Sequence, residues 1–241
     1  MIYFVSDIHL GFHLREQDKK RENNFIDFLE NIRTDCKELF LLGDIFDYWF
    51  EYKTVIPAPF YRTLAKISEL IDDGIKIEYL MGNHDFGHKD FFKNEFGIDI
   101  IKTDIERTLN GKRFYLSHGD GKAYNDKPYL MLRAILRNRV CQKIYSFLHP
   151  DCGISMALGT SRKSRKYTDN KNYGAKDGLK DFAEKKISEG FDFVIMGHRH
   201  LAETVHFSKG IYINLGEWFQ NPHYAKFDGE NLELIPYNAK S

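Results

Sequence analysis

Histidine, aspartate and asparagine recur in five short clusters along this chain of 241 residues. The clusters are Asp7-Ile8-His9, Gly43-Asp44-Ile45-Phe46-Asp47, Gly82-Asn83-His84-Asp85, His118-Gly119-Asp120 and Gly197-His198-Arg199-His200. A mixture of imidazole and carboxylate suits Zn, Mn, Fe or Co, whereas Mg or Ca prefers oxygen ligands alone. The residue types therefore predict a site for transition-metal ions.

The spacing within the clusters lets two side chains reach the same ion. In Asp7-x-His9 and in His198-x-His200, both side chains lie on one side of an extended backbone, because alternate residues share a face. Asp44 has two carboxylate oxygens and is the natural candidate to bridge two ions. The glycines before three of the clusters permit sharp turns. Each cluster alone could be an ordinary turn or surface pair, but five in succession favour a metal site.

Each cluster follows an apolar run of four to seven residues, which predicts a buried strand. These runs span residues 1–6, 38–42, 75–81, 113–117 and 191–196. Helical patterns at 22–33 and 59–73 separate the first three runs and predict a βαβαβ start with parallel strands. Further hairpins are predicted at Asn110-Gly111, Lys209-Gly210 and Asp228-Gly229. We expect an α/β fold with two sheets packed face to face between helices, and the five clusters beyond the carboxyl ends of the strands.

The stretch from 121 to 172 does not follow this pattern of strands. Its apolar residues recur three or four positions apart, as on one face of a helix: Tyr129, Leu132, Leu136, Val140, Ile144 and Phe147. We interpret it as a helical cap inserted at about 122–171, in which a basic loop, 160–171, returns the chain to the main fold. We predict a mixed arrangement, in which part of the apolar face packs against the main domain and part lines an apolar pocket that opens towards the metal site. Residues 1–241 then form a single domain with this insertion.

The composition excludes several functional classes. Lys and Arg (35) balance Asp and Glu (35), which argues against a generic nucleic-acid binder, and the 42% hydrophobic content excludes a disordered chain. Residues 121–166, however, include ten basic and only two acidic residues, so this segment carries a net charge of +8 and the remainder one of −8. Such a separation of charge indicates a patch for an anionic partner.

The sequence also predicts a cellular location. Three cysteines without a Cys-x-x-Cys pair argue against a disulfide framework and favour reduced thiols in the cytoplasm. The first residues lack the basic stretch of a signal peptide, and no window approaches 18 uninterrupted apolar residues. We therefore expect a cytoplasmic protein without a membrane span.

The five clusters, in this order over residues 1–200, resemble the five motifs of the calcineurin-like metallophosphoesterases. The resemblance implies a β-sandwich flanked by helices and the hydrolysis of phosphate esters or anhydrides. It also implies two divalent metal ions, with Mn²⁺ favoured and Fe or Zn as alternatives. By matching positions, it assigns the first metal to Asp7, His9, Asp44 and His200, and the second to Asp44, Asn83, His118 and His198.

Residues beside these ligands are candidates for catalysis. His84 could stabilise charge on the phosphoryl oxygens and protonate the departing oxygen as a general acid. Asp85 could orient that imidazole or cap a helix, and the sequence favours neither role. Asp47 is expected to hydrogen-bond to a metal ligand, whereas Asp120 could do the same or hold its own loop.

Within this family, the chain more closely resembles the UDP-2,3-diacylglucosamine hydrolases of lipid A biosynthesis. The features that carry the resemblance are His118-Gly119-Asp120, the basic helical insertion after it, and Leu215-Gly216-Glu217-Trp218. They imply cleavage of the pyrophosphate of UDP-2,3-diacylglucosamine into UMP and 2,3-diacylglucosamine 1-phosphate, a lipid monophosphate. The substrate contacts implied by position are Asn83, His84, Asp126, Ser164, Lys171 and His198. His84 is a departure, because these hydrolases usually carry Arg there, whereas phosphoesterases at large carry His.

Three functions follow from these observations. The leading one is a pyrophosphatase of a lipid-linked nucleotide sugar, bound peripherally to the inner face of the cell membrane. Its cap would offer an apolar face to acyl chains and positive charge to phosphates and headgroups. The alternative is a soluble phosphodiesterase or nuclease of the same superfamily, although a nuclease would favour a long basic groove. A metal-free interaction scaffold is the third. We expect no nucleic-acid partner and no obligate protein partner.

Overall fold

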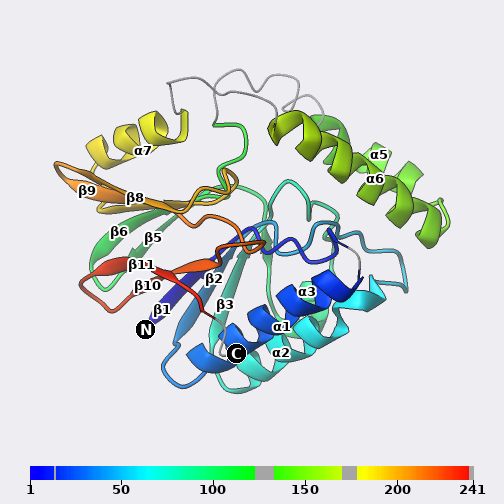
Figure 1. Cartoon of the computed structure of the whole chain (residues 1–241), viewed down its shortest axis with the longest axis horizontal. Helices are drawn as coiled ribbons and strands as arrows, with labels where there is room; N and C mark the ends of the chain where they lie inside the picture. Colours follow the sequence, from blue (N-terminus) through cyan, green and yellow to red (C-terminus); the bar gives the residue numbers. More distant parts are fainter. Residues whose placement is uncertain (14, 123–132, 170–177, 239–241) are drawn as a thin grey trace.

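The computed structural model describes residues 1–13, 15–122, 133–169 and 178–238, and within them two β-sheets face each other (Figure 1). The first sheet has the strand order β11 (Leu232–Pro236), β10 (His223–Phe227), β1 (Ile2–Val5), β2 (Glu38–Leu42), β3 (Lys76–Leu80) and β4 (Ile100–Ile101). The second has the order β5 (Ile105–Leu109), β6 (Lys112–Leu116), β7 (Phe193–Met196), β9 (Gly210–Asn214) and β8 (Glu203–Phe207). Strands β1 to β4 run parallel, as do β6, β7 and β9. The predicted two-sheet α/β architecture is therefore confirmed.

Helices cover the outer faces of both sheets (Figure 1). Along the first sheet lie α1 (Arg15–Ile32), α2 (Tyr61–Asp72) with a short 3₁₀ turn before it (Ala58–Phe60), and α3 (Phe91–Phe96). Helix α7 (Gly178–Ser188) packs on β7 and β9 of the second sheet. Two further helices, α5 (Arg139–Tyr145) and α6 (Pro150–Asp169), lie apart from these layers.

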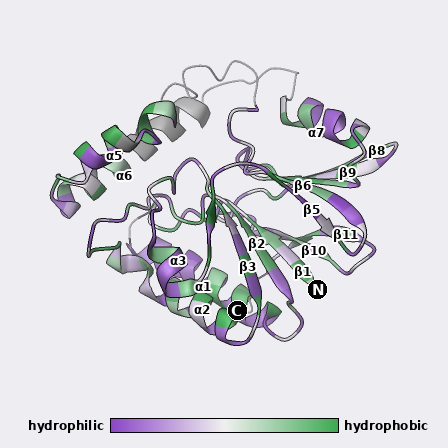
Figure 2. Ribbon diagram, turned by 180° about the vertical axis from the view of Figure 1, so that it is seen from behind, coloured by the Kyte–Doolittle hydropathy of each residue, from purple (hydrophilic) through white to green (hydrophobic). Residues whose placement is uncertain are grey.

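Alternating side chains along the strands build the core on both faces of the first sheet. In β1, Tyr3 and Val5 point to the helices, whereas Phe4 points between the sheets and stacks on Phe40 of β2, with ring centroids 5.0 Å apart. Apolar residues consequently fill the strands in the interior (Figure 2). A strand buried on both faces reads as a continuous apolar run, which is why the strands were evident in the sequence.

The predicted turns agree with the structure. Asn110 and Gly111 connect β5 to β6, both with positive φ (47° and 80°), as a two-residue hairpin turn requires. The loops that contain Lys209 and Asp228-Gly229 connect the antiparallel pairs β8–β9 and β10–β11. Helix α1, in contrast, begins at Arg15, seven residues before the predicted start. Its first turns bury polar residues, such as Asp18 and Glu22, so they lack the apolar period that reveals a helix.

The cap differs from its prediction in two respects. The expected basic loop over 160–171 is wrong as far as Asp169, because α6 continues to that residue. The apolar face is also not one uninterrupted helix: Asn138 accepts hydrogen bonds from the amides of Val140 and Cys141 and so begins α5 as an N-cap. Of the predicted face, Tyr129 and Leu132 lie outside the described residues, and Leu136 lines a small pocket beside Asn83. Val140 and Ile144 are exposed, so the predicted mixture of inward packing and pocket lining is wrong for these two residues.

Two negative predictions also bear on the fold. None of the helices in the described ranges combines the length and apolar character that crossing a membrane requires. The three cysteines are unpaired, with Cys36 buried and Cys141 and Cys152 exposed.

Candidate functional site

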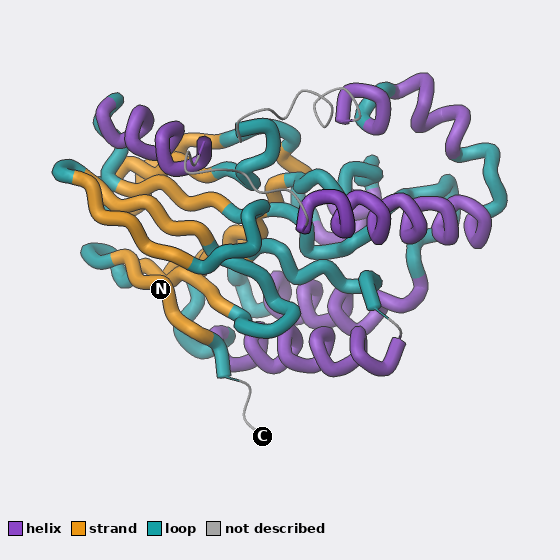
Figure 3. Tube along the Cα trace, turned by 45° about the horizontal axis from the view of Figure 1, so that its top comes forward, coloured by secondary structure: helices purple, strands orange, loops and turns teal. Residues whose placement is uncertain are grey.

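All five polar clusters lie at the carboxyl ends of strands. Asp7, Asp44, His118 and His198 each come two residues after a strand, namely β1, β2, β6 and β7, and Asn83 comes three residues after β3. Since these strands run parallel within their sheets, their ends meet at one edge of the sandwich. Figure 3 shows the loops that follow the strands gathered between the sheets and the α5–α6 pair.

The backbone at these clusters is unusual. Among the described residues, six residues other than glycine have a positive φ, and five of them belong to the clusters: Asp7, His9, Asp44, His198 and His200. This left-handed conformation costs on the order of 1–3 kcal/mol per residue and persists where the surrounding structure enforces it. The presence of five such residues in the clusters indicates that these loops adopt a strained backbone in order to place the side chains.

Two of the predicted glycines are required by close approach. A Cβ atom at Gly82 would overlap the carboxylate and amide of Asp44, and one at Gly197 would overlap the carboxylate of Asp7 and the side chain of Ser6. Both glycines thus let two strand-end loops approach each other. The amide of His198 then donates to Asp7 Oδ2 (2.9 Å).

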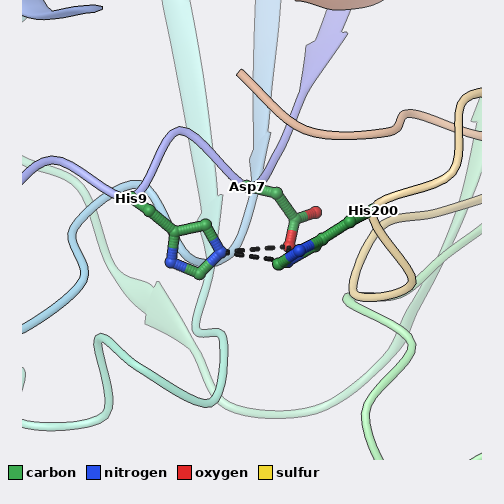
Figure 4. A group of neighbouring side chains, drawn as sticks. All are labelled: Asp7, His9 and His200. Atoms are coloured by element: carbon green, nitrogen blue, oxygen red, sulfur yellow. Dashed lines mark hydrogen bonds and ion pairs between the residues drawn. The ribbon is translucent and has the colours of Figure 1, made fainter. Parts of the chain in front are cut away.

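One group of side chains consists of Asp7, His9 and His200 (Figure 4). The Nε2 atoms of the two histidines are 3.2 Å apart, and Asp7 Oδ1 lies 3.5 Å from that of His9 and 3.2 Å from that of His200. Figure 4 shows both neighbours converging on the same ring nitrogen of His9. Its other nitrogen, Nδ1, is 3.2 Å from Asp47 Oδ1, so Asp47 lies behind this group, as predicted.

A second group surrounds Asn83. Its Oδ1 atom is 2.9 Å from His118 Nε2 and 2.8 Å from His198 Nδ1. The other ring nitrogen of His118 is 2.9 Å from the carbonyl oxygen of Leu42, which fixes the ring orientation. An amide oxygen facing two imidazole nitrogens can become a ligand set without rearrangement of the loops.

Asp44 lies between the two groups. Its Oδ2 atom is 3.7 Å from His9 Nε2 in the first group and 3.3 Å from His118 Nε2 in the second. Its Oδ1 atom accepts a hydrogen bond from the amide of His84 (2.7 Å). The structure thus brings together the seven residues of the predicted metal site, with Asp44 in the position that a bridging ligand needs.

The electrostatics of the site favour a bound cation. Burial alone would raise the pKa of Asp44 and of Asp7, but the neighbouring histidines hold both well below the ordinary range. Burial lowers the pKa of His118, yet the charge of Asp44 outweighs it and raises that pKa to about 10. Burial, followed by the charge of His118, lowers the pKa of His198 to about 4. The carboxylates are therefore ionised next to positive charge, which the imidazoles supply here and a bound cation would supply in their place.

The donor atoms also fit a metal ion. Asp7 Oδ1 is fully buried and makes no hydrogen bond of good geometry within the described residues, although two imidazole nitrogens lie within 3.5 Å. Two Nε2 atoms that face each other need a proton or a metal ion between them. Nitrogen and carboxylate ligands of this kind suit Mn, Fe or Zn.

The candidate catalytic residues flank the Asp44 side of the site. His84 is partly buried, and its Nδ1 atom lies 3.3 Å from Asp47 Oδ1. Asp85 is fully buried and accepts hydrogen bonds from the amides of Ile45 and Gly82 and from the hydroxyl of Tyr79. The carboxylate of Asp85 thus ties the loop after β3 to the loop after β2 and fixes the backbone that carries His84.

Asp120 links the site to the cap. Its Oδ2 atom is 2.6 Å from a guanidinium nitrogen of Arg133 and 3.6 Å from one of Arg137. Arg137 also donates to the carbonyl oxygen of Gly82 (3.0 Å), next to Asn83. A small pocket opens here, lined by Asn83, Phe86, Arg133, Leu136 and Arg137.

Three expected substrate contacts are not described at side-chain level. Asp126 and Lys171 lie outside the described residues, and Ser164 lies on α6, where only the backbone is described. The other three, Asn83, His84 and His198, lie in the metal site itself. The structure further adds a residue that the sequence did not single out, Phe219, whose ring stacks on His9. Its only signal was its position directly after Leu215-Gly216-Glu217-Trp218.

Comparison with known proteins agrees with this geometry. Residues 1–202 match the model of the family described as calcineurin-like phosphoesterase. A UDP-2,3-diacylglucosamine hydrolase of Porphyromonas gingivalis is 34% identical, covering 97% of this chain and 96% of that protein. A protein of the same name from Haemophilus influenzae is 28% identical, covering 91% of each. A solved archaeal phosphodiesterase shares the fold, with a TM-score of 0.50, 15% identity and 98% of each chain covered.

Proposed function

This chain belongs to the calcineurin-like phosphoesterase family, and on that premise we propose that it hydrolyses the pyrophosphate of UDP-2,3-diacylglucosamine. The products would be UMP and 2,3-diacylglucosamine 1-phosphate. The observation that carries the proposal is the near full-length similarity to hydrolases of that name, combined with the convergence of seven candidate metal ligands at the strand ends. The family match and these relatives indicate a hydrolase, so the metal-free scaffold is set aside.

We assign two divalent metal ions to this site, with Mn²⁺ as the preferred identity. Asp7, His9, Asp44 and His200 would hold one ion, and Asp44, Asn83, His118 and His198 the other. When bound, such ions supply positive charge to the phosphoryl oxygens and lower the pKa of water towards neutrality. The protein's own contribution is to hold the donor atoms in place, since backbone and loop contacts already fix Asp44, Asn83 and His118.

His84 is assigned the role of general acid and phosphoryl-binding residue. It is partly exposed beside Asp44, so its imidazole can reach a bound phosphate and donate a proton to the departing oxygen. Asp47, 3.3 Å from His84 Nδ1, would keep this ring oriented. Asp85 acts indirectly, because it fixes the loop that carries His84 and does not itself contact the substrate.

The cap is assigned to the lipid half of the substrate and to the membrane. Val140, Ile144 and Phe147 on and after α5 are 65%, 64% and 81% exposed, and Met156 on α6 is also exposed. Figure 2 shows apolar residues on both helices. Exposed apolar side chains in a basic segment suit a peripheral contact with an anionic membrane surface, here the cytoplasmic face of the cell membrane. Acyl chains and anionic headgroups are present together there.

A hydrolysis panel tests the proposal directly. With Mn²⁺, the protein should cleave UDP-2,3-diacylglucosamine far faster than a UDP-sugar without acyl chains, bis-p-nitrophenyl phosphate or single-stranded DNA. Mass spectrometry of the products would show UMP and the lipid monophosphate, without release of inorganic phosphate. Equal rates on acylated and unacylated substrates would instead favour the soluble phosphodiesterase, and preference for DNA would favour the nuclease.

A further inference from the structure

Phe219 lies flat against a residue of the candidate metal site. Its ring is stacked on His9, with centroids 5.5 Å apart and an interplanar angle of 15°, and it lies 6.1 Å from the ring of His200. We propose that Phe219 is a positioning residue for the metal ion held by Asp7, His9 and His200. The inference rests on the two-metal assignment made above.

The loop that carries Phe219 is fixed to the site from its other side. The amide of Trp218 donates to the carbonyl oxygen of Asp7 (3.2 Å). The carboxylate of Glu217 accepts hydrogen bonds from the amides of Phe219 and Gln220. Since Trp218 is itself buried in the core of the first sheet, the position of Phe219 is set by the fold rather than by the ligand.

A buried arginine holds the same ring. The guanidinium carbon of Arg21 lies 4.5 Å from the centroid of Phe219, and Arg21 is only 5% exposed. Arg21 pairs with Asp18 (2.7 Å), whose other oxygen accepts from the amide of Gly11 (2.5 Å). Gly11 is two residues beyond His9. Asp18 therefore connects Arg21, which holds the ring of Phe219, to the loop that carries His9.

The two metal groups are therefore supported by different means. Asn83, His118 and His198 are held by polar contacts, including the carbonyl oxygen of Leu42. In the first group, the edge of His9 is held by Asp47 and its face by Phe219. The side chain of His200 is 32% exposed, and the ring of Phe219 lies beside it. A substitution at Phe219 should accordingly weaken the binding of one metal ion and leave the binding of the other unchanged.

The experiment measures Mn²⁺ binding to the metal-free protein by calorimetry, without substrate. The wild type should bind two ions. Phe219→Ala should weaken one binding step by about 10- to 100-fold, the range for residues that orient metal ligands, and leave the other step unchanged. Phe219→Tyr keeps the flat ring and should restore the affinity to within a few-fold of the wild type. Phe219→Leu keeps apolar bulk without the ring and should stay weak.

Phe182→Ala is the matched control, because Phe182 is also a partly buried aromatic residue but lies on α7 and packs on Tyr115, away from the site. It should leave both binding steps unchanged. The inference is overturned if Phe219→Ala binds both ions like the wild type, if both steps weaken equally, or if Leu serves as well as Tyr. Should the Ala variant not fold, the comparison of Tyr with Leu decides. A wild type that binds no Mn²⁺ would overturn the two-metal assignment as well.

Discussion

The metal centre and the cap are built on opposite principles. The metal centre gathers side chains from five strand ends, buries Asp7, His9, Asp44 and His118 almost completely, and fixes them through backbone and loop contacts. Helices α5 and α6 contribute side chains that are largely exposed, such as Val140 and Met156. The cap meets the main fold through contacts such as Arg133 on Asp120 and Tyr145 on Phe50, whose rings are 4.7 Å apart.

This difference separates two tasks. Phosphate hydrolysis needs ligand atoms held to within fractions of an ångström, and strand ends in a packed core provide that. Acyl chains are flexible and carry no directional groups, so an apolar surface with few fixed contacts can accept them. The metal centre should therefore determine whether any phosphate compound is cleaved, and the cap should determine which one.

The largest expected effect concerns Asp44, which lies between the two metal groups. Asp44→Ala should abolish hydrolysis of every substrate and remove both metal ions, because both would share this carboxylate. Asp44→Asn keeps a residue that tolerates a left-handed backbone and should fail in the same way. Elemental analysis of the purified variants measures the metal content. Asp27→Ala, an exposed residue of α1, is the matched control, and two tightly bound metal ions in Asp44→Ala would disprove the bridging role.

The next effect separates catalysis from metal binding. His84→Ala should retain both metal ions and lower turnover by about 10²–10⁴-fold, the usual range for a general acid. His206→Ala, an exposed histidine on strand β8, should have no effect on either quantity. Loss of metal from His84→Ala would make His84 a ligand instead.

His84→Arg asks whether a guanidinium can replace the imidazole at this position. A guanidinium still binds phosphoryl oxygens, so this variant should keep substantial activity on the acylated substrate. Steady-state kinetics on UDP-2,3-diacylglucosamine would measure it. A loss as deep as that of His84→Ala would mean that proton donation, rather than phosphate binding, is the essential role of His84.

A third change acts on the cap alone. Replacing Val140, Ile144 and Phe147 together by Ser should lower kcat/KM on vesicle-bound UDP-2,3-diacylglucosamine by about 10- to 100-fold, because each side chain loses part of the roughly 1.5–3 kcal/mol of full burial. Hydrolysis of bis-p-nitrophenyl phosphate should be unchanged. Metal content and melting temperature should also match the wild type, since these residues are exposed. An equal loss on both substrates would remove the division of tasks described above.

The smallest expected effect is at the contact between the two regions. Arg137→Met removes the hydrogen bond to Gly82 and the ion pair to Asp120. Its loss should reduce kcat/KM by about 3- to 10-fold on both substrates, as expected for a hydrogen bond worth roughly 1 kcal/mol in net terms. Lys143→Met removes an exposed charge from the same cap and is the control. If only the lipid substrate is affected, Arg137 contacts that substrate rather than coupling the regions.

Predictability from the sequence differs between the two regions for a physical reason. The convergence of the candidate ligands was predictable, because each side chain follows a buried strand within a few positions and parallel strand ends must meet. In the cap, Asn138 interrupts the apolar period by capping α5, and the Lys- and Arg-rich end of α6 has the composition of a solvated loop although it is helical. Periodicity does not detect either feature.

Tertiary contacts explain the remaining differences. Asp85 could orient His84 or cap a helix as far as the sequence goes, but its partners Ile45, Tyr79 and Gly82 come from three separate segments. Phe219 is an ordinary aromatic residue until the fold brings it against His9. Roles that depend on a partner distant in the sequence carry no local pattern from which they could be predicted.

The left-handed backbone at Asp7, His9, Asp44, His198 and His200 also restricts how this site can change over evolutionary time. Asp, Asn and His are enriched several-fold in that conformation, whereas a β-branched residue there is a genuine outlier. Inherited exchanges among Asp, Asn and His preserve the turns, so they can shift the preferred metal by single mutations. A lineage that needed other ligand types would first have to remodel the strand ends. The backbone thus limits which substitutions these positions tolerate, so the range of metals that such an enzyme can bind depends on its fold.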